Sequence, residues 1–407
     1  MKRDLCLICD SKNLTKILDL GNHAYADTFI APARAHDLLP VYNLSCAMCE
    51  ECGQIQACCI TDPDDRYNLY DYSYTSSNSS VARSHWQHFC SDVCEVLNLP
   101  REIKVVEIGS NDGYLMGRFK ERGATVMGVD ASHYVSKIAV SNGIQTINEI
   151  FDEQLAEKII KNNGKFNLAI ANNVFNHSDD PLSFARGVNK TLVDDGYFVY
   201  ELPYWRCSVK SRKFDQVYHE HVSYFTARSS KKIMELAGFE IKNIEVVDYH
   251  GGSLRVYARK TNEAIPKHCQ ELFNMIQEES FLFDAQTYHV ALEEFQRLKY
   301  NFLSKIMEIK LSNLPVVAIG AAAKGNTFLR FMNLDHTIVD YVTDVSSHKQ
   351  GKLTPLTNIP IVGDEIFAQY KAVYAIILSW NLSDKIKTKL LEINPEIQFL
   401  NFYKEFE

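Results

Sequence analysis

The chain has 407 residues, of which 46% are hydrophobic and 23% charged, and its formal net charge is −8. This length predicts two to four domains, and the acidic balance argues against the broad basic surface that non-specific nucleic-acid binding needs. No apolar run reaches the ~18 residues of a membrane span, and no apolar signal core follows Lys2-Arg3, so we expect a cytoplasmic protein without a membrane partner.

Residues 1–65 predict a zinc-binding domain. Seven of the 11 cysteines lie before residue 60, and in a cytoplasmic protein such clustering favours metal binding over disulfides. Cys6-x-x-Cys9 and Cys49-x-x-Cys52 each place two thiolates across a tight turn, so together they offer four soft ligands to tetrahedral zinc. Because protein fills all four positions, the predicted zinc is structural.

The second of these knuckles has a competing partner. Cys46 has the same spacing to Cys49 as Cys52 has, but Gly53 suits the turn of a knuckle and favours the Cys49–Cys52 pair. Buried, reduced cysteines without metal are the alternative. Cys58 lies in an apolar run and is expected in the core.

Residues 66–80 are too polar for a core element. Tyrosines alternate with polar residues there and run into a stretch of serines, which predicts a loop or edge element that lines a site. The tyrosines that matter below are Tyr72 and Tyr74.

From about residue 81 the chain alternates between helical and strand patterns. This alternation predicts an α/β fold with a doubly wound, parallel sheet. Helices are expected at 85–97, 114–122, 134–142 and 182–192, and strands at 104–108, 125–129, 167–171 and 197–202.

A candidate cofactor site lies at the ends of three of these strands. The string Glu107-Ile-Gly109-Ser-Asn111-Asp112-Gly113 follows a strand and opens a helix, without the Gly-x-Gly-x-x-Gly spacing or lysine of a pyrophosphate cradle. Asp130 ends the next strand, where a carboxylate can accept both hydroxyls of a ribose, and Asn172 ends a third. A glycine-containing acidic loop followed by a strand-end acid resembles class I S-adenosylmethionine-dependent methyltransferases.

Residues 214–225, the acid–base segment, hold the densest cluster of proton-transfer groups. Its core reads Tyr218-His219-Glu220-His221. A histidine can carry a proton near neutral pH, Glu220 could orient it, and Tyr218 could donate to a developing oxyanion. The spacing is not His-Glu-x-x-His, which excludes a zinc-protease motif. An aromatic core strand with one satisfied histidine is the alternative.

The remaining sequence predicts a helical connector and a second α/β unit. Residues 263–311 carry apolar positions at helical spacing and form a long helix or a helical hairpin; strands are expected at 316–319, 338–342 and 372–378, and a helix at 327–332. The small-residue turn that contains Lys324 and Asn326, with Lys352 further on, suits a nucleotide diphosphate. His250-Gly251-Gly252 permits close approach of a ligand or forms a plain turn.

Taken together, the motifs resemble the sugar C-methyltransferases of deoxysugar biosynthesis. The matching strings occur in family order: Cys6-x-x-Cys9, Cys49-Glu-Glu-Cys52-Gly-Gln, Glu107-Ile-Gly-Ser-Asn-Asp-Gly113, Tyr218-His-Glu-His221-x-Ser-Tyr224, His250-Gly-Gly-Ser-Leu-Arg255 and Ala323-Lys-Gly-Asn-Thr327. The resemblance implies a zinc-binding domain (1–65), an S-adenosylmethionine-dependent methyltransferase domain (66–262), and a connector with a Rossmann-type nucleotide-sugar-binding domain (263–407).

The implied reaction is methyl transfer to C3 of a nucleotide-linked 4-keto-6-deoxyhexose. His221 is expected to be the base, Tyr218 to stabilise the enolate oxygen and Glu220 to support them, with His219, His177 and Asn176 as alternative proton carriers. By similarity, the cofactor is held by Glu107, Gly109, Asn111, Asp112, Gly113, Asp130, Asn172 and Tyr74. The nucleotide sugar is expected to meet Tyr72, His250, Gly251, Lys324, Asn326 and Lys352.

Two other functions compete with this hypothesis. A nucleic-acid methyltransferase that uses the zinc domain as a reader is disfavoured by the net charge and by the lack of a basic stripe. A non-catalytic nucleotide-sugar-binding protein is disfavoured by the acid–base segment beside an intact cofactor loop. A monomer or a homodimer is expected.

Overall fold

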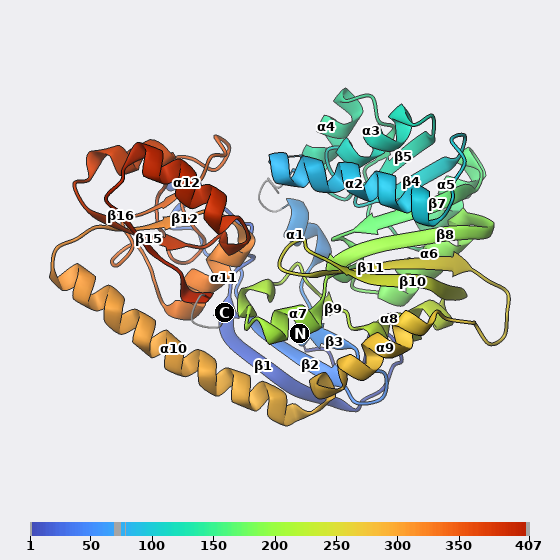
Figure 1. The fold of residues 1–407 in the computed structure, drawn as a ribbon, viewed down its shortest axis with the longest axis horizontal. Coiled ribbons are helices and arrows are strands. Elements are labelled where there is room, and N and C mark those ends of the chain that lie inside the picture. Colours follow the sequence, from blue (N-terminus) through green and yellow to red (C-terminus); the bar gives the residue numbers. More distant parts are fainter. Residues whose placement is uncertain (1, 69–74, 78, 404–407) are drawn as a thin grey trace.

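The computed structural model describes residues 2–68, 75–77 and 79–403 (Figure 1). Three sheets organise these residues, and the second and third are the α/β sheets that the sequence predicts. The N-terminal sheet lies between the two α/β units in Figure 1. The domain boundaries themselves stay predictions.

The N-terminal sheet contains a strand from far along the chain. Its antiparallel order is β1-β2-β3-β9, with β1 at Leu14–His23, β2 at Tyr42–Cys49, β3 at Ile55–Ala57 and β9 at Ser223–Tyr224. Ile55 of β3 faces Tyr224 of β9. The end of the acid–base segment is therefore built into the sheet that follows the first cysteine knuckle. Helix α1 (Pro63–Asn68) comes next.

The central unit is a seven-stranded sheet of order β10-β11-β8-β7-β4-β5-β6. Only β11 runs opposite to its neighbours among these strands. The strands are β4 (Lys104–Ile108), β5 (Thr125–Val129), β6 (Thr146–Ile147), β7 (Phe166–Asn172), β8 (Leu192–Pro203), β10 (Phe239–Val247) and β11 (Ser253–Lys260). This is the doubly wound arrangement of class I methyltransferases, and the chain order reverses at β4.

Helices cover both faces of this sheet. They are α2 (Ser80–Val96), α3 (Tyr114–Glu121), α4 (His133–Ser141), α5 (Glu153–Asn163), α6 (Pro181–Thr191) and α8 (Ala227–Leu236). The short helix α7 (Trp205–Lys210) instead packs against residues 214–216. Polar side chains cap several starts: Asp152 accepts from Leu155 N, and Asp180 accepts from Ser183 N. The predicted helix at 85–97 begins earlier because Ser79 caps it.

The C-terminal unit is a parallel five-stranded sheet of order β14-β13-β12-β15-β16. Its elements are β12 (Val316–Ile319), α11 (Ala323–Met332), β13 (Tyr341–Thr343), β14 (Ile361–Val362), β15 (Val373–Ile377), α12 (Ser383–Ile393) and β16 (Ile397–Leu400). Helix α11 starts four residues before the predicted start because Ala323 and Lys324 are good helix formers. The connector is helix α9 (Gln270–Glu278) followed by the 27-residue α10 (Ala285–Leu311), which crosses the lower edge of Figure 1.

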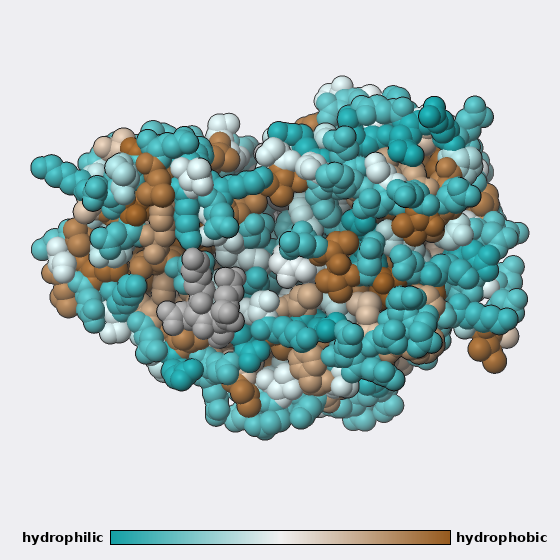
Figure 2. Space-filling model, viewed as in Figure 1, coloured by the Kyte–Doolittle hydropathy of each residue, from teal (hydrophilic) through white to brown (hydrophobic). Residues whose placement is uncertain are grey.

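Apolar core side chains pack against both the central and the C-terminal sheets. Val105, Leu168 and Val199 of neighbouring central strands are fully buried. Figure 2 shows a face that is mostly hydrophilic, with small apolar patches scattered over it. Among the described residues, no helix combines the length and apolarity that a membrane crossing needs.

Candidate functional site

The four predicted zinc ligands converge. The Sγ atoms of Cys6, Cys9, Cys49 and Cys52 all lie within 4.8 Å of one another, with 3.5 Å between Cys6 and Cys52 and 3.6 Å between Cys9 and Cys49. Zinc about 2.3 Å from each of four tetrahedral sulfurs needs sulfur pairs roughly 3.8 Å apart, so the donors fit zinc. Hydrogen bonds from Cys52 and Cys6 lower the pKa of Cys49, which favours a thiolate. Cys46, the competing ligand, is outside this cluster, buried on β2.

The predicted cofactor loop follows β4, where the strand order of the central sheet reverses. Gly109 and Gly113 have φ of 73° and 78°, in the left-handed region that favours glycine. A Cβ on Gly109 would stand 2.6 Å from Cβ of Val174, so a larger residue would push the loop away from the segment after β7. Helix α3 begins directly after the loop, and its first N–H groups can meet a ligand there.

Asn111 and Asp112 hold the polar segment that precedes α2. The N–H of Ser76 donates to Oδ1 of Asn111 over 2.8 Å, and its hydroxyl donates to Oδ1 of Asp112 over 2.5 Å. The N–H of Ser77 donates to Oδ2 of Asp112 over 3.0 Å. The sequence marks these serines only as part of a polar stretch. Two predicted site tyrosines lie outside the described residues: Tyr72 and Tyr74.

Three polar side chains end neighbouring strands of the central sheet. Asp130 accepts hydrogen bonds from the N–H groups of Asn111 (2.8 Å) and Ser132 (2.9 Å), and burial raises its pKa to about 6. Burial, with the charges of nearby carboxylates, raises the pKa of Glu107 well above its ordinary range. Oε2 of Glu107 and both amide atoms of Asn172 are buried and have no hydrogen-bond partner within the part of the chain that the structure describes. Each such atom costs about 1–3 kcal/mol, so this edge is suited to a polar ligand.

His221 and Tyr218 lie against each other within the acid–base segment. Their ring centroids are 4.0 Å apart, and Nδ1 of His221 lies 2.8 Å from the Gln216 carbonyl oxygen. Because that contact makes Nδ1 the donor, Nε2 is the nitrogen that can accept a proton. Burial, together with the charge of Lys324, lowers the pKa of His221 to about 3, so its imidazole is neutral. The ring of His177 is 5.2 Å from that of His221.

The loop after β7 joins the cofactor edge to the acid–base segment. Its short helix η2 (Phe175–His177) follows Asn172, and the carbonyl of Asn176 accepts the N–H of Val222 over 2.9 Å. The guanidinium of Arg66 donates to the His177 carbonyl over 3.3 Å and pairs with Asp179. Burial and the neighbouring His221 lower the pKa of His177 well below its usual range.

Glu220 and His219 turn toward the N-terminal part of the chain. Oε1 of Glu220 accepts the N–H of Asp27 over 3.3 Å, and Nδ1 of His219 lies 3.2 Å from the Ala24 carbonyl. Among the described residues, no contact joins Glu220 to His221, so the expected support of the imidazole is not a direct one. Burial, then the charge of Asp27, raises the pKa of Glu220 to about 7.

Lys324 reaches the acid–base segment from the C-terminal unit. Its Nζ lies 4.8 Å from the centre of the Trp380 ring. Nζ of Lys324 and Nδ1 of His250 are both buried, and no described residue forms a hydrogen bond with either atom. Burial lowers the pKa of Lys324 to about 8 against the opposing charge of Asp215, so it remains a cation at neutral pH. Gly251 has a φ of 84°, and a Cβ there would stand 2.5 Å from the Trp380 ring. Two domains therefore meet at His250, Gly251 and Lys324.

Asn326 and Lys352 lie apart from this meeting point. The side-chain amide of Asn326 donates to the Ala26 carbonyl over 2.6 Å. Nζ of Lys352 lies 3.2 Å from Nε2 of His348, whose ring stacks at 5.4 Å on Tyr134 of α4. Both residues thus sit where the C-terminal unit contacts other parts of the chain.

A buried ion pair beside the site joins Arg255, which ends one of the matching strings, to two residues that no motif marks. Nε2 of His85 lies 2.6 Å from Oε1 of Glu201, and Nε of Arg255 donates to Oε2 over 2.8 Å. The His85 ring stacks at 3.7 Å on Tyr249, the residue before His250. A glutamate at the end of a buried strand is the one signal that could have found it.

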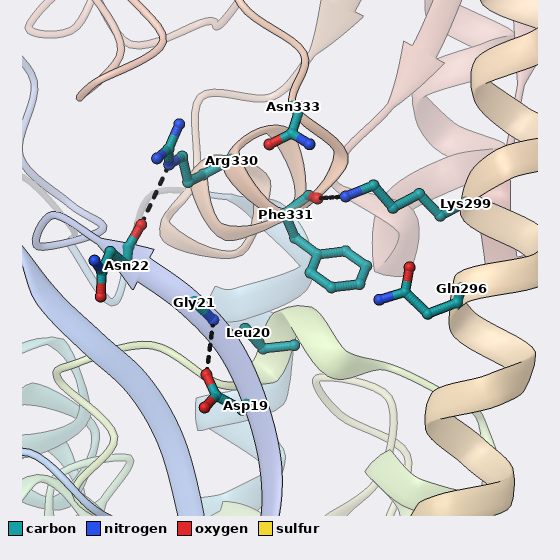
Figure 3. Close-up of a pocket in the computed structure, with 9 residues that line it drawn as sticks. All are labelled: Asp19, Leu20, Gly21, Asn22, Gln296, Lys299, Arg330, Phe331 and Asn333. Carbon is teal, nitrogen blue, oxygen red and sulfur yellow. Dashed lines mark hydrogen bonds between the residues drawn. The ribbon is translucent and has the colours of Figure 1, made fainter.

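A cavity of about 290 Å³ lies elsewhere, between β1, α10 and the end of α11 (Figure 3). None of the predicted site residues lines it. Lys299 donates to the Phe331 carbonyl, and Nε of Arg330 donates to the Asn22 carbonyl over 3.2 Å. Both cations are therefore hydrogen-bonded to backbone carbonyls. The cavity is a junction between elements and not the predicted site.

Three family models match consecutive parts of the chain. Residues 6–67 match a family described as a zinc binding domain, residues 82–244 a methyltransferase domain, and residues 248–399 a C-methyltransferase C-terminal domain. C-methyltransferase NovU of Streptomyces niveus is 26% identical over 98% of this chain and 93% of its own length. The chain is an S-adenosylmethionine-dependent C-methyltransferase.

Solved methyltransferase structures are similar to only part of this C-methyltransferase. Magnesium protoporphyrin IX methyltransferase of Synechocystis PCC 6803, solved with bound S-adenosylhomocysteine, is 15% identical over 46% of this chain and 90% of its own, with a TM-score of 0.36. The methyltransferase complex with the Trm112 activator of Haloferax volcanii is 12% identical over 50% of this chain and 100% of that chain, also with a TM-score of 0.36. The assignment rests on the family matches and the curated relative. The cofactors of this C-methyltransferase are thus S-adenosylmethionine and a structural zinc.

Proposed function

We propose that this C-methyltransferase methylates C3 of a nucleotide-linked 4-keto-6-deoxyhexose through an enolate, in deoxysugar biosynthesis. The observation that carries the proposal is the close contact between the rings of His221 and Tyr218, whose centroids are 4.0 Å apart. A neutral imidazole and a phenol face each other there, and the charge of Lys324 reaches the same imidazole from another domain. A base, an oxyanion donor and a phosphate-binding cation are the groups that this substrate needs.

The edge of the central sheet suits S-adenosylmethionine. The carboxylate of Asp130 would accept the ribose hydroxyls, and the unpaired atoms of Glu107 and Asn172 would meet polar groups of the same ligand. Gly109 and Gly113 leave room for its close approach. When bound, the cofactor supplies an electrophilic methyl group.

His221 removes the proton from C3 of the sugar. The neighbouring C4 carbonyl makes that proton acidic, and the electron pair of the broken C–H bond moves into the enolate. Nε2 of His221 takes the proton, while the hydroxyl of Tyr218 donates to the enolate oxygen. The anion that forms beside the imidazole offsets the desolvation that otherwise lowers the pKa of His221. C3 then accepts the methyl group, and His221 later releases its proton to water.

The alternative proton carriers fit this step less well. His219 is engaged with the Ala24 carbonyl and packs edge-on against Tyr25, so its ring faces the N-terminal part of the chain. His177 lies beside His221, and we propose that it shapes the pocket around the base.

The nucleotide is proposed to lie toward the C-terminal unit. Lys324 stands in the first turn of α11, where backbone N–H groups and its own charge favour a diphosphate. His250 and Gly251 would form the facing wall, with Asn326 and Lys352 further along. Tyr72 and Tyr74 are proposed to close over the cofactor or the sugar.

Mass spectrometry after incubation with a panel of nucleotide-linked 4-keto sugars tests the function. We expect a mass gain of one methylene with at least one of them. In deuterated water, the enzyme should also exchange the C3 hydrogen of that sugar. Methyl transfer without any exchange would contradict the stepwise enolate, and no transfer to any 4-keto sugar would contradict the substrate class.

A further inference from the structure

Residues 24–30, here called the strap, form a buried link that contains no helix and no strand, only the isolated bridge of Ile30 with Leu353. The strap leaves β1, and each of residues 23–30 is buried. Irregular backbone is rarely buried, because its polar groups then need partners from elsewhere in the chain. Just before the strap, at the end of β1, Arg330 of α11 donates to the Asn22 carbonyl (Figure 3).

On one side the strap is bonded to the C-terminal unit. The Asn326 side chain donates to the Ala26 carbonyl over 2.6 Å. The backbones of Ile30 and Leu353 exchange two hydrogen bonds, of 3.0 and 2.8 Å. Asn326, which the sequence predicts to meet the nucleotide sugar, is therefore bonded to the strap. Ile30 and Leu353 have no predicted role.

On its other side the strap is bonded to the acid–base segment. Nδ1 of His219 meets the Ala24 carbonyl at 3.2 Å, and Tyr25 packs edge-on against the same ring at 5.9 Å. The N–H of Asp27 donates to Oε1 of Glu220 over 3.3 Å. The strap therefore fixes the residues immediately before His221.

Asp27 stands between the two sides. Its Oδ1 lies 4.0 Å from Nζ of Lys349, and both side chains are nearly inaccessible, at 8% and 11% exposure. Lys349 is itself fixed, because it donates to the Ala321 carbonyl over 2.6 Å and lies over the Phe29 ring at 4.8 Å. The Lys349 ammonium is thus opposed to the carboxyl group of Asp27, whose N–H is bonded to Glu220.

We propose that Asp27 is a positioning residue of the methyl-transfer site, which couples Glu220 of the acid–base segment to Lys349 of the C-terminal unit. In this role a residue of the N-terminal region sets the charge and the place of the segment that carries the base. The role in turnover rests on the proposed function; the coupling between the carboxyl groups does not.

The charged groups around Glu220 give this coupling a measurable sign. Burial is the largest cause that raises the pKa of Glu220, and the charge of Asp27 is the second. The charge of Arg66 lowers this pKa. His219 is neutral, because burial lowers its pKa to about 4, and Lys349 acts on Glu220 through Asp27. Removal of the Asp27 charge should therefore lower the pKa of Glu220.

Carbon-13 NMR of protein labelled at the glutamate carboxyl groups tests the coupling without any turnover. Glu220→Gln identifies the resonance by its loss. Asp27→Asn should shift the midpoint of that resonance down by about 1 pH unit. Asp37→Asn, which removes an exposed carboxylate that pairs with Arg34, should leave it in place. An unchanged midpoint in Asp27→Asn would overturn the proposal.

The second arm measures turnover on the substrate found by mass spectrometry. Asp27→Asn should lower kcat/KM roughly 10- to 100-fold through misplacement of the acid–base segment, while zinc content and S-adenosylmethionine affinity stay unchanged. Asp27→Glu, which keeps the charge, should recover part of the loss. Equal losses in Asp27→Glu and Asp27→Asn would overturn the role of the charge. If the wild-type protein methylates no sugar, the proposed function fails, and the NMR result still decides the coupling.

Discussion

The indole nitrogen of Trp380 donates a 2.7 Å hydrogen bond to Oδ2 of Asp215. Trp380 follows β15 of the C-terminal unit, and Asp215 directly precedes Gln216, whose carbonyl meets Nδ1 of His221. The proposed base is therefore two contacts away from a side chain of the C-terminal sheet. A displacement of Trp380 would therefore move the imidazole through Asp215 and Gln216.

Loss of this hydrogen bond should weaken binding of the nucleotide sugar. Trp380→Phe keeps a ring beneath Lys324 but removes the indole donor from the Asp215 carboxylate, which should cost about 1.5–3 kcal/mol, or roughly 10- to 100-fold in KM. Steady-state kinetics measure it. Trp86→Phe is the control, because the buried Nε1 of Trp86 has no hydrogen-bond partner among residues 2–68, 75–77 and 79–403. Equal KM changes in the two variants would speak against the contact.

Gly251→Ala should disturb the docking of Trp380. The new methyl would stand 2.5 Å from the indole ring at a backbone φ of 84°, and we expect a loss of about 1–3 kcal/mol in the free energy of unfolding beyond the backbone strain. Gly21→Ala is the matched variant, since its φ is 83° and nothing lies within 4 Å of the added methyl. Urea unfolding of both proteins checks the difference, which should vanish if the indole can move aside freely.

Binding of S-adenosylmethionine should weaken as the pH falls through about 6. Burial raises the pKa of Asp130 to that value, and only the ionised carboxylate accepts strongly from both ribose hydroxyls. The favourable form is therefore present above pH 6 and is lost below it. Calorimetric titrations between pH 5 and 8 measure this dependence. Asp130→Asn should bind about 10- to 100-fold more weakly at pH 8 and lose the dependence; a retained dependence would assign it to another group.

His221→Asn should lower turnover by roughly 10²- to 10⁴-fold with cofactor affinity unchanged, because the general base is gone. Since burial lowers the pKa of His221 to about 3, this base stays deprotonated above pH 5, and its ionisation should not limit kcat/KM between pH 5 and 8. Rapid-quench kinetics on His221→Asn and His219→Asn compare the two histidines. A larger loss in His219→Asn would move the role of base to His219.

Metal analysis should find one zinc per chain. Cys49→Ser should lose it and release the N-terminal sheet and the strap, because the metal joins the two knuckles that bracket β1 and β2. Cys58→Ser lies outside the cluster and should retain zinc. Zinc content and protease sensitivity are measured for both variants. One zinc per chain in Cys49→Ser would exclude this thiol as a ligand.

Local patterns carried most of what the sequence could predict. Two Cys-x-x-Cys turns, buried strand runs and strand-end residues such as Asp130 depend on neighbours in the chain, and the structure gathers them as expected. The predicted preference for Cys52 over Cys46 agrees with the sulfur cluster.

Contacts between distant segments were beyond reach of the sequence. Asp27 lies in a stretch without periodicity, and no residue near it in the sequence indicates a contact with Glu220 or Lys349. Ser76 and Ser77 look like ordinary loop residues until the fold brings Asp112 to them. Trp380 lies in no motif, and its contacts with Gly251 and Asp215 join residues far apart in the sequence.

The pairing of Ile55 with Tyr224 bears on how the polypeptide is made. As the nascent chain leaves the ribosome, β3 emerges long before the strand that will cover it. Until β9 appears, β3 presents unpaired amides and carbonyls, the kind of edge that invites aggregation. Early capture of zinc by the knuckles would hold this half-finished sheet together until the rest of the chain arrives, so metal supply during translation should govern the yield of native protein.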